Sequence, residues 1–241
     1  MWQNAKSELV PTGVLRAAIN MGNSLLVTGT TPSGDPVGIA ADMAAAIAER
    51  LGVPVSYVPY KSPGELADAA GSNIWDVGLI GAEPARAEKI AFTAAYVEIE
   101  ATYLVLAGSP LNSIAEVDRP GIRIGVSARS AYDLWLTANL KHAELVRTQG
   151  VKAAFAMFLA EKHDAFACLR PDLLPRAADL PGSRILEGNF TTVQQAVGTA
   201  RSLLAAATFL HQFVEEAKSS GLVARLIERH QVKGLTVASP A

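Results

Sequence analysis

Short apolar runs alternate with amphipathic stretches along most of the chain. In the first such unit, residues 14–19 predict a strand, and a loop rich in Gly, Thr and Pro follows at 21–37. We expect a helix that begins at Asp42, with apolar residues four apart, to end at Gly52, and a second strand at 53–58. A helix between two strands predicts a β-α-β unit, which joins parallel strands.

The same alternation continues towards the C-terminus. It predicts further strands at 75–80, 102–107, 123–126, 164–169 and 184–186, and helices at 63–70, 84–89, 130–140, 151–160, 203–218 and 222–230. Because strands and helices alternate in this way, we expect the α/β class with parallel sheets.

The composition excludes several classes of function. Half of the 241 residues are apolar and 18% are charged, as in globular chains with a sizeable core. The net charge of −2 leaves no basic excess for a phosphate backbone, so we expect no nucleic-acid partner. No run reaches about 18 apolar residues, so we expect no membrane-spanning helix.

The N-terminus has no signal-peptide pattern. We therefore expect a cytoplasmic protein if Met1 is the native start and a periplasmic one if a leader was removed.

Metal and cofactor chemistry has little support in the sequence. The only cysteine, Cys168, stands in an apolar run, where we expect a buried structural thiol. The four histidines lack the spacing of metal ligands, and we expect His163 at the surface. There is no glycine-rich phosphate loop. We therefore predict no cofactor and no metal site.

Open α/β sheets bind ligands beyond the carboxyl ends of their strands, and three such places carry polar groups. Asn20 and Asn23 follow the first strand, where they could contact a ligand or only form a turn. A later strand leads through Ser127 to a Ser-x-x-Asp capping pattern that begins at Ser130. A helix start of this kind favours an anion, although Asp133 already places a negative charge there.

The third place is Arg86, in a stretch that begins at Gly81, directly after the strand at 75–80. A guanidinium presents a planar fork that matches a carboxylate. Arg86 could equally form an exposed ion pair of little energy with Glu83, three residues before it. Spacing alone does not separate these two interpretations.

Several stretches together resemble one protein family. They are residues 13–16, 38–43, 75–77, 84–86, 90–93, Tyr96, 124–126 and 164–165, with the C-terminal helices. In this order and spacing, over about residues 12–230, the chain resembles the solute-binding proteins of bacterial ABC importers, of the polar amino-acid-binding type (extracellular solute-binding protein family 3).

This resemblance implies two doubly wound α/β lobes joined by two crossover strands, the periplasmic-binding-protein-like II fold. The implied parts are lobe one, 1–105 with 194–241; lobe two, 106–193; and crossovers near 103–105 and 192–195. A ligand would be captured in the cleft by hinge closure, and we include Gln195 among the binding candidates. The resemblance also implies a monomer without enzyme activity, with an ABC transporter permease as a possible partner.

In the family, an arginine six residues before a Phe-Thr pair grips the ligand's carboxylate, and Arg86 stands there. A hydroxyl at the start of the lobe-two helix assists it, and Ser130 matches that position. Glu83 departs from the family's Thr or Ser, and the usual amine-binding Asp falls on Leu169, followed by Arg170. Two small carboxylate ligands therefore stay open: an amino acid whose ammonium meets Glu83, or an amine-free organic acid held by Arg86 and Arg170.

Two other functions use related folds. A free-standing ligand sensor is one alternative, if Met1 is the native start. A dehydratase-like enzyme is the other, and it would need a positioned acid or base, for which Glu83 is the only good candidate.

Overall fold

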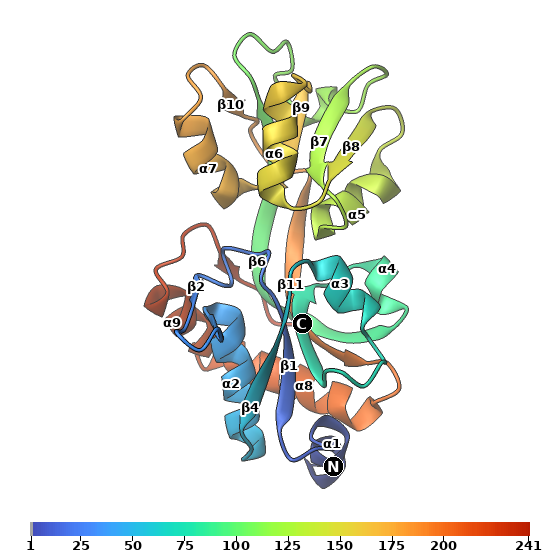
Figure 1. Cartoon of the computed structure of the whole chain (residues 1–241), viewed down its shortest axis with the longest axis vertical. Coiled ribbons are helices and arrows are strands. Elements are labelled where there is room, and N and C mark those ends of the chain that lie inside the picture. Colours follow the sequence, from blue (N-terminus) through green and yellow to red (C-terminus); the bar gives the residue numbers. More distant parts are fainter. Residues whose placement is uncertain (1) are drawn as a thin grey trace. The chain divides into compact units, whose positions relative to one another are not determined.

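The computed structural model describes residues 2–241, which form two compact units (Figure 1). Unit 1 consists of the described residues up to Glu98 with Gln194–Ala241, and unit 2 of Ile99–Val193. The chain passes from one unit to the other twice, within the strands β6 (Ile90–Val105) and β11 (Thr191–Ala200). No helix in the described part of the chain is both long and apolar enough to cross a membrane.

Unit 1 is built on a sheet with the strand order β4-β1-β5-β11-β6, and β12 pairs with β6. Its elements are α1 (Trp2–Leu9), β1 (Leu15–Asn20), β2 (Gly29–Thr30), β3 (Pro36–Val37), α2 (Ile39–Leu51), β4 (Val55–Tyr60), α3 (Pro63–Asp68), β5 (Val77–Gly81), α4 (Pro84–Ala87), α8 (Leu204–Ser219), α9 (Leu222–Arg229) and β12 (Thr236–Val237). β1 pairs in parallel with both β4 and β5, whereas β11 runs antiparallel to β5.

Unit 2 continues from β6 in the strand order β6-β9-β7-β8, and β10 pairs with β6. Its elements are the 3-10 helix η1 (Ile114–Glu116), β7 (Arg123–Ser127), α5 (Ala131–Asn139), β8 (Glu144–Thr148), α6 (Val151–Ala160), β9 (Ala165–Leu169), α7 (Arg170–Ala178) and β10 (Arg184–Ile185). β7 is parallel to β8 and β9, but β6 is antiparallel to β9. The α/β class is confirmed, whereas purely parallel sheets are wrong because the two crossover strands enter antiparallel to their neighbours.

The helix α2 follows from the apolar spacing of its sequence. Met43, Ile47 and Leu51 form its buried face and are at most 2% exposed. Gly52 ends the helix in the left-handed conformation, as predicted, because glycine has no Cβ to clash there. The helix begins at Ile39, so the predicted start at Asp42 is wrong by three residues, and Asp42 lies in the first turn.

In each unit a carboxylate ties two parallel strands together near their amino ends. In unit 1, Asp76 accepts the backbone N–H of Arg16 at 2.8 Å and binds its guanidinium through both carboxylate oxygens, at 2.6 and 3.0 Å. In unit 2, Asp164 accepts the backbone N–H of Arg123 at 2.8 Å. These contacts hold the strands in register, so the opposite, carboxyl ends of the same strands are placed together as well.

Candidate functional site

Several predicted ligand-binding residues of unit 1 come from one edge of its sheet. β1 and β5 are parallel neighbours, so their carboxyl ends, at Asn20 and Gly81, lie at the same edge. Gln195 of β11 pairs directly with Gly81 and is 5% exposed. Arg86 lies in α4, five residues after the end of β5. This is the edge at which open α/β sheets bind ligands.

Arg86 is held in a buried position in unit 1. The residue is 5% exposed, and its Nη1 donates a hydrogen bond of 2.7 Å to the carbonyl oxygen of Gly81. The alternative of an exposed ion pair with Glu83 is therefore wrong, because the guanidinium does not lie in solvent. A buried cation is costly unless other groups compensate it, and a guanidinium has five donors with which to bind an anion.

Glu83 precedes α4 and is half-buried beside Arg86. Although it occupies the N-cap position, its side chain makes no capping hydrogen bond. Burial raises the pKa of the Glu83 carboxyl, and the charge of Arg86 offsets part of that rise. A carboxylate and a guanidinium three residues apart can together hold the two opposite charges of a zwitterion.

The two asparagines have a local structural role. The side-chain oxygen of Asn20 accepts the N–H of Gly22, and that of Asn23 accepts the N–H of Leu25, each at 3.1 Å. These are turn contacts of the kind Asn makes with the backbone two residues on. These turns use only the side-chain oxygens. We therefore keep the prediction that the amide NH₂ groups of both residues contact a ligand.

In unit 2, Ser127 ends β7 and Ser130 caps α5. The hydroxyl of Ser130 accepts the N–H of Asp133 at 3.1 Å, which is the predicted cap. The Asp133 carboxylate accepts the N–H of Arg129 at 2.7 Å and the Nε–H of Arg147 at 2.9 Å. The helix start is thus already neutralised from within the unit, and its anion-binding capacity is reduced.

Arg170 is the first residue of α7, at the carboxyl end of β9. Its Nε donates to the Glu100 carboxylate at 2.6 Å, and its Nη2 donates to the carbonyl of Gly188. The Arg170 guanidinium, predicted as a possible second carboxylate clamp, is therefore already hydrogen-bonded within unit 2. No element over 170–178 was predicted, so this orientation could not be anticipated.

Two predictions about buried groups have opposite outcomes. Cys168 is fully buried, as predicted, with its sulfur 3.7 Å from the Tyr132 hydroxyl, and burial raises the pKa of the thiol to about 12. The predicted surface position of His163 is wrong, because the residue is 2% exposed and its Nε2 lies 3.1 Å from the Glu161 carboxylate. In residues 2–241 no group of three His, Cys, Asp or Glu residues could hold a metal ion.

Sequence reasoning missed one carboxylate, Asp172. It is half-buried in the first turn of α7, three residues after β9 ends at Leu169. Its charge adds to the effect of burial in raising the pKa of Tyr132, two residues after the α5 cap. An Asp in the first turn of a helix after a buried strand would have been the signal, but that helix was not predicted.

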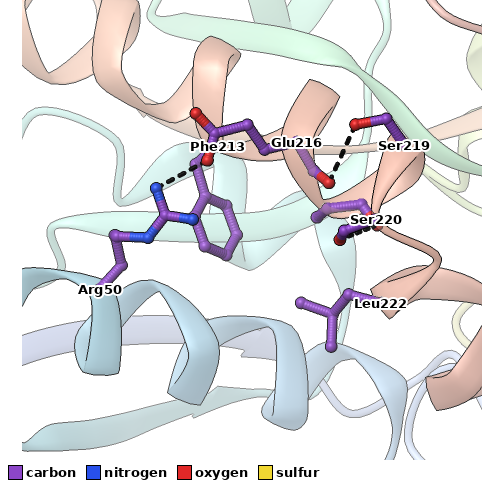
Figure 2. Close-up of a pocket in the computed structure, with 7 residues that line it drawn as sticks. Arg50, Phe213, Glu216, Ser219, Ser220 and Leu222 are labelled. Atoms are coloured by element: carbon purple, nitrogen blue, oxygen red, sulfur yellow. Dashed lines mark hydrogen bonds and ion pairs between the residues drawn. The ribbon is translucent and has the colours of Figure 1, made fainter.

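A hollow of about 350 Å³ in unit 1 lies elsewhere, at the C-terminal ends of α2 and α8 (Figure 2). Arg50 of α2 crosses it, 2.7 Å from the carboxylate of Glu216 and over the ring of Phe213 at 5.7 Å. Helices in α/β units return from the carboxyl edge of the sheet, so the end of α2 is remote from β1 and β5 carboxyl ends. We do not assign the ligand to this hollow.

Comparison with known proteins agrees with this architecture. The family model described as bacterial extracellular solute-binding proteins, family 3, matches residues 23–233. No curated protein matches the chain.

Among solved structures, a mutant of ArgBP from T. maritima shares 20% identity, with 94% of this chain and 99% of that chain covered and a TM-score of 0.76. An amino acid ABC transporter substrate-binding protein from Streptococcus pneumoniae, bound to L-arginine, shares 20% identity, with 97% and 99% covered and a TM-score of 0.75. The ancestral amino acid-binding protein AncCDT-1, a precursor of cyclohexadienyl dehydratase, shares 18% identity, with 93% and 97% covered and a TM-score of 0.76. The chain has the type II periplasmic-binding-protein fold and belongs to the bacterial extracellular solute-binding proteins, family 3.

Proposed function

We propose that this chain captures a small carboxylate-bearing solute for an ABC-type importer, with Arg86 as the carboxylate clamp. One observation carries the proposal: a buried guanidinium is oriented by the Gly81 carbonyl at the ligand-binding edge of the unit 1 sheet. A fixed planar fork binds a carboxylate at a smaller entropic cost than a mobile side chain.

Two observations favour an amino acid over an amine-free acid as the ligand. Arg170 already donates to Glu100 and Gly188, which makes it a poor second clamp for an organic acid. Glu83 lies beside Arg86 and can accept an ammonium group. The similar protein from Streptococcus pneumoniae is bound to L-arginine, which is in accord with this class.

Capture would proceed by hinge closure about β6 and β11, the two strands shared by the units. Ser127 and Ser130 of unit 2 would join Arg86, with Gln195 as a further contact. The ligand would shift the open–closed equilibrium only by the difference between its contacts in the two states. The family's description as extracellular supports a place outside the cytoplasm, where a permease would receive the loaded protein.

Thermal unfolding with single amino acids and with amine-free acids tests the ligand class. A ligand present at 100 times its dissociation constant should add about 2.7 kcal/mol to the free energy of unfolding. For a protein of this size that corresponds to a rise in Tm of about 5–10 °C. Stabilisation by amine-free acids alone would contradict the amino-acid assignment.

Two variants test the residues once a ligand is found. Arg86→Met should weaken binding roughly 30-fold or more, because it removes a charged hydrogen-bonding partner. Since this variant could also destabilise unit 1, the wild-type protein is tested with the ligand's carboxamide, which should bind equally weakly. Glu83→Gln should weaken amino-acid binding, whereas Glu88→Gln, an exposed neighbour on the same turn, should not. Full affinity in Arg86→Met and for the carboxamide would refute the clamp.

A further inference from the structure

The segment that carries Arg86 is tied to β11 at both of its ends. Before α4, the N–H of Ala82 donates to the carbonyl of Gln194 at 2.7 Å. At the end of α4, the Nη1 of Arg201, the residue that follows β11, donates to the carbonyl of Ala87 at 2.5 Å. The segment from Ala82 to Ala87 is therefore hydrogen-bonded near the start of β11 and again to the residue that follows the end of β11.

α4 needs such an external partner because it is a single turn of four residues. A helix this short has too few internal hydrogen bonds to offset the cost of its nucleation. Its last carbonyl groups lack partners within the helix. Arg201 supplies donors here, through its side chain to the carbonyl of Ala87, the last residue of α4, and through its backbone N–H to that of Lys89 at 3.0 Å.

The side chain of Arg201 is exposed, so it contributes little to the core. Its contact with Ala87 nevertheless joins segments that are 114 positions apart in the sequence. Ala87 is the residue directly after Arg86, so the hydrogen bond fixes the backbone from which the Arg86 side chain projects. The Gly81 carbonyl then fixes the guanidinium itself.

We propose that Arg201 is a positioning residue for Arg86, and that it sets the precision with which unit 1 holds a carboxylate. This inference rests on the proposed role of Arg86 as the clamp. Binding groups must be held within about 0.5 Å of their productive geometry by neighbours that are themselves fixed. Arg201 provides this support from the end of β11, whereas Gln195, near the start of that strand, pairs with Gly81.

Three variants separate positioning from general stability. Arg201→Met removes the side-chain donors but keeps an unbranched apolar stem, and Arg201→Lys restores a charged donor group. Arg225→Met is the matched control, because Arg225 is also exposed in unit 1 and its Nη1 also donates to a backbone carbonyl, that of Ser220, at 2.9 Å.

Hydrogen exchange provides a readout that needs no ligand. The backbone N–H groups of Arg86, Ala87 and Lys89 donate within the turn, at 2.9, 3.0 and 3.1 Å. In Arg201→Met we expect these amides to exchange about three- to ten-fold faster, the change that the loss of one hydrogen bond produces. Arg201→Lys should be intermediate and Arg225→Met unchanged. Wild-type exchange rates at these amides in Arg201→Met would overturn the inference.

Affinity for L-arginine and for L-argininamide, which lacks the carboxylate, then tests the link to binding. Arg201→Met should bind L-arginine about three- to ten-fold more weakly and so lose part of its preference over the amide. A full preference for L-arginine in this variant, despite faster exchange, would overturn the positioning role. If the wild-type protein binds neither probe, the proposed ligand class loses support, while the exchange rates still decide the role of Arg201.

Discussion

Replacing Gly198 with alanine introduces a methyl group for which β11 has no room. A Cβ at this position would lie 2.3 Å from Cγ2 of Ile90 and 3.1 Å from two ring carbons of Phe92. Carbon atoms in favourable contact are about 3.5–4.0 Å apart, so the closest pair would overlap by more than about 1 Å. Ile90 cannot easily move aside, because it is 2% exposed and packs in a cluster with Ile80 and Trp75.

Overpacking of this kind costs about 1–3 kcal/mol in the free energy of unfolding. For a protein of about 240 residues each kcal/mol lowers the Tm by about 2–4 °C, so we expect a decrease of about 2–12 °C. Guanidinium unfolding followed by circular dichroism measures the free energy directly. Gly29→Ala is the control, since a Cβ there meets nothing within 4 Å, and it should change stability by less than about 0.5 kcal/mol.

A double-mutant cycle with Ile90→Ala identifies the cause. If the overlap with Ile90 destabilises Gly198→Ala, then Ile90→Ala should cost less in that background than in the wild-type protein. The reasoning is refuted if Gly198→Ala is as stable as Gly29→Ala, or if the two costs simply add.

Three further predictions concern contacts outside the candidate site. Glu8 of α1 accepts the N–H of Ala206 at 2.8 Å and caps α8, which has no side-chain cap of its own, so Glu8→Ala should lower the free energy of urea unfolding by about 0.5–2 kcal/mol. Cys168 should react with Ellman's reagent at pH 8 only as fast as the protein unfolds, because its pKa is raised to about 12, and rapid labelling of the native protein would contradict this. Burial raises the pKa of Asp118, but the backbone N–H groups of 141–143 outweigh it and hold the pKa below its usual value. The stability that Asp118 adds is therefore present above the ordinary Asp pKa of about 4 and is lost as the pH falls below it, so Asp118→Asn should be less stable than wild type at pH 7 and equal to it near pH 2.

Elements with strong local signals could be predicted from the sequence. The helix at 151–160 has the predicted bounds, and α2 ends at Gly52 as expected. Local chemistry is sufficient in these cases, because helical hydrogen bonds and a left-handed glycine involve only neighbouring residues. The cap of α5 by Ser130 was predictable for the same reason.

Elements whose partners are distant in the sequence were mispredicted. β6 runs over 90–105, whereas only 102–107 was predicted, because its Ala, Thr and Glu residues show no alternation and its pairing comes from β9, β10, β11 and β12. β8 was missed as a short edge strand, and α1 as a short helix that packs on α8. The reason is local for α7, which was missed because Pro171 and Pro175 favour a loop.

The candidate site also has features that the sequence predicts and features that depend on distant partners. The sequence by itself determined that a guanidinium follows β5 at Arg86, since residue order alone places it just after a buried strand. Only the tertiary structure decided that Arg86 is buried and bound to Gly81, that Arg170 turns to Glu100, and that Arg201 supports the turn from 114 positions away. The physical reason is that a local pattern determines which element forms, whereas the partner of a long polar side chain depends on which distant backbone the fold brings within hydrogen-bonding distance.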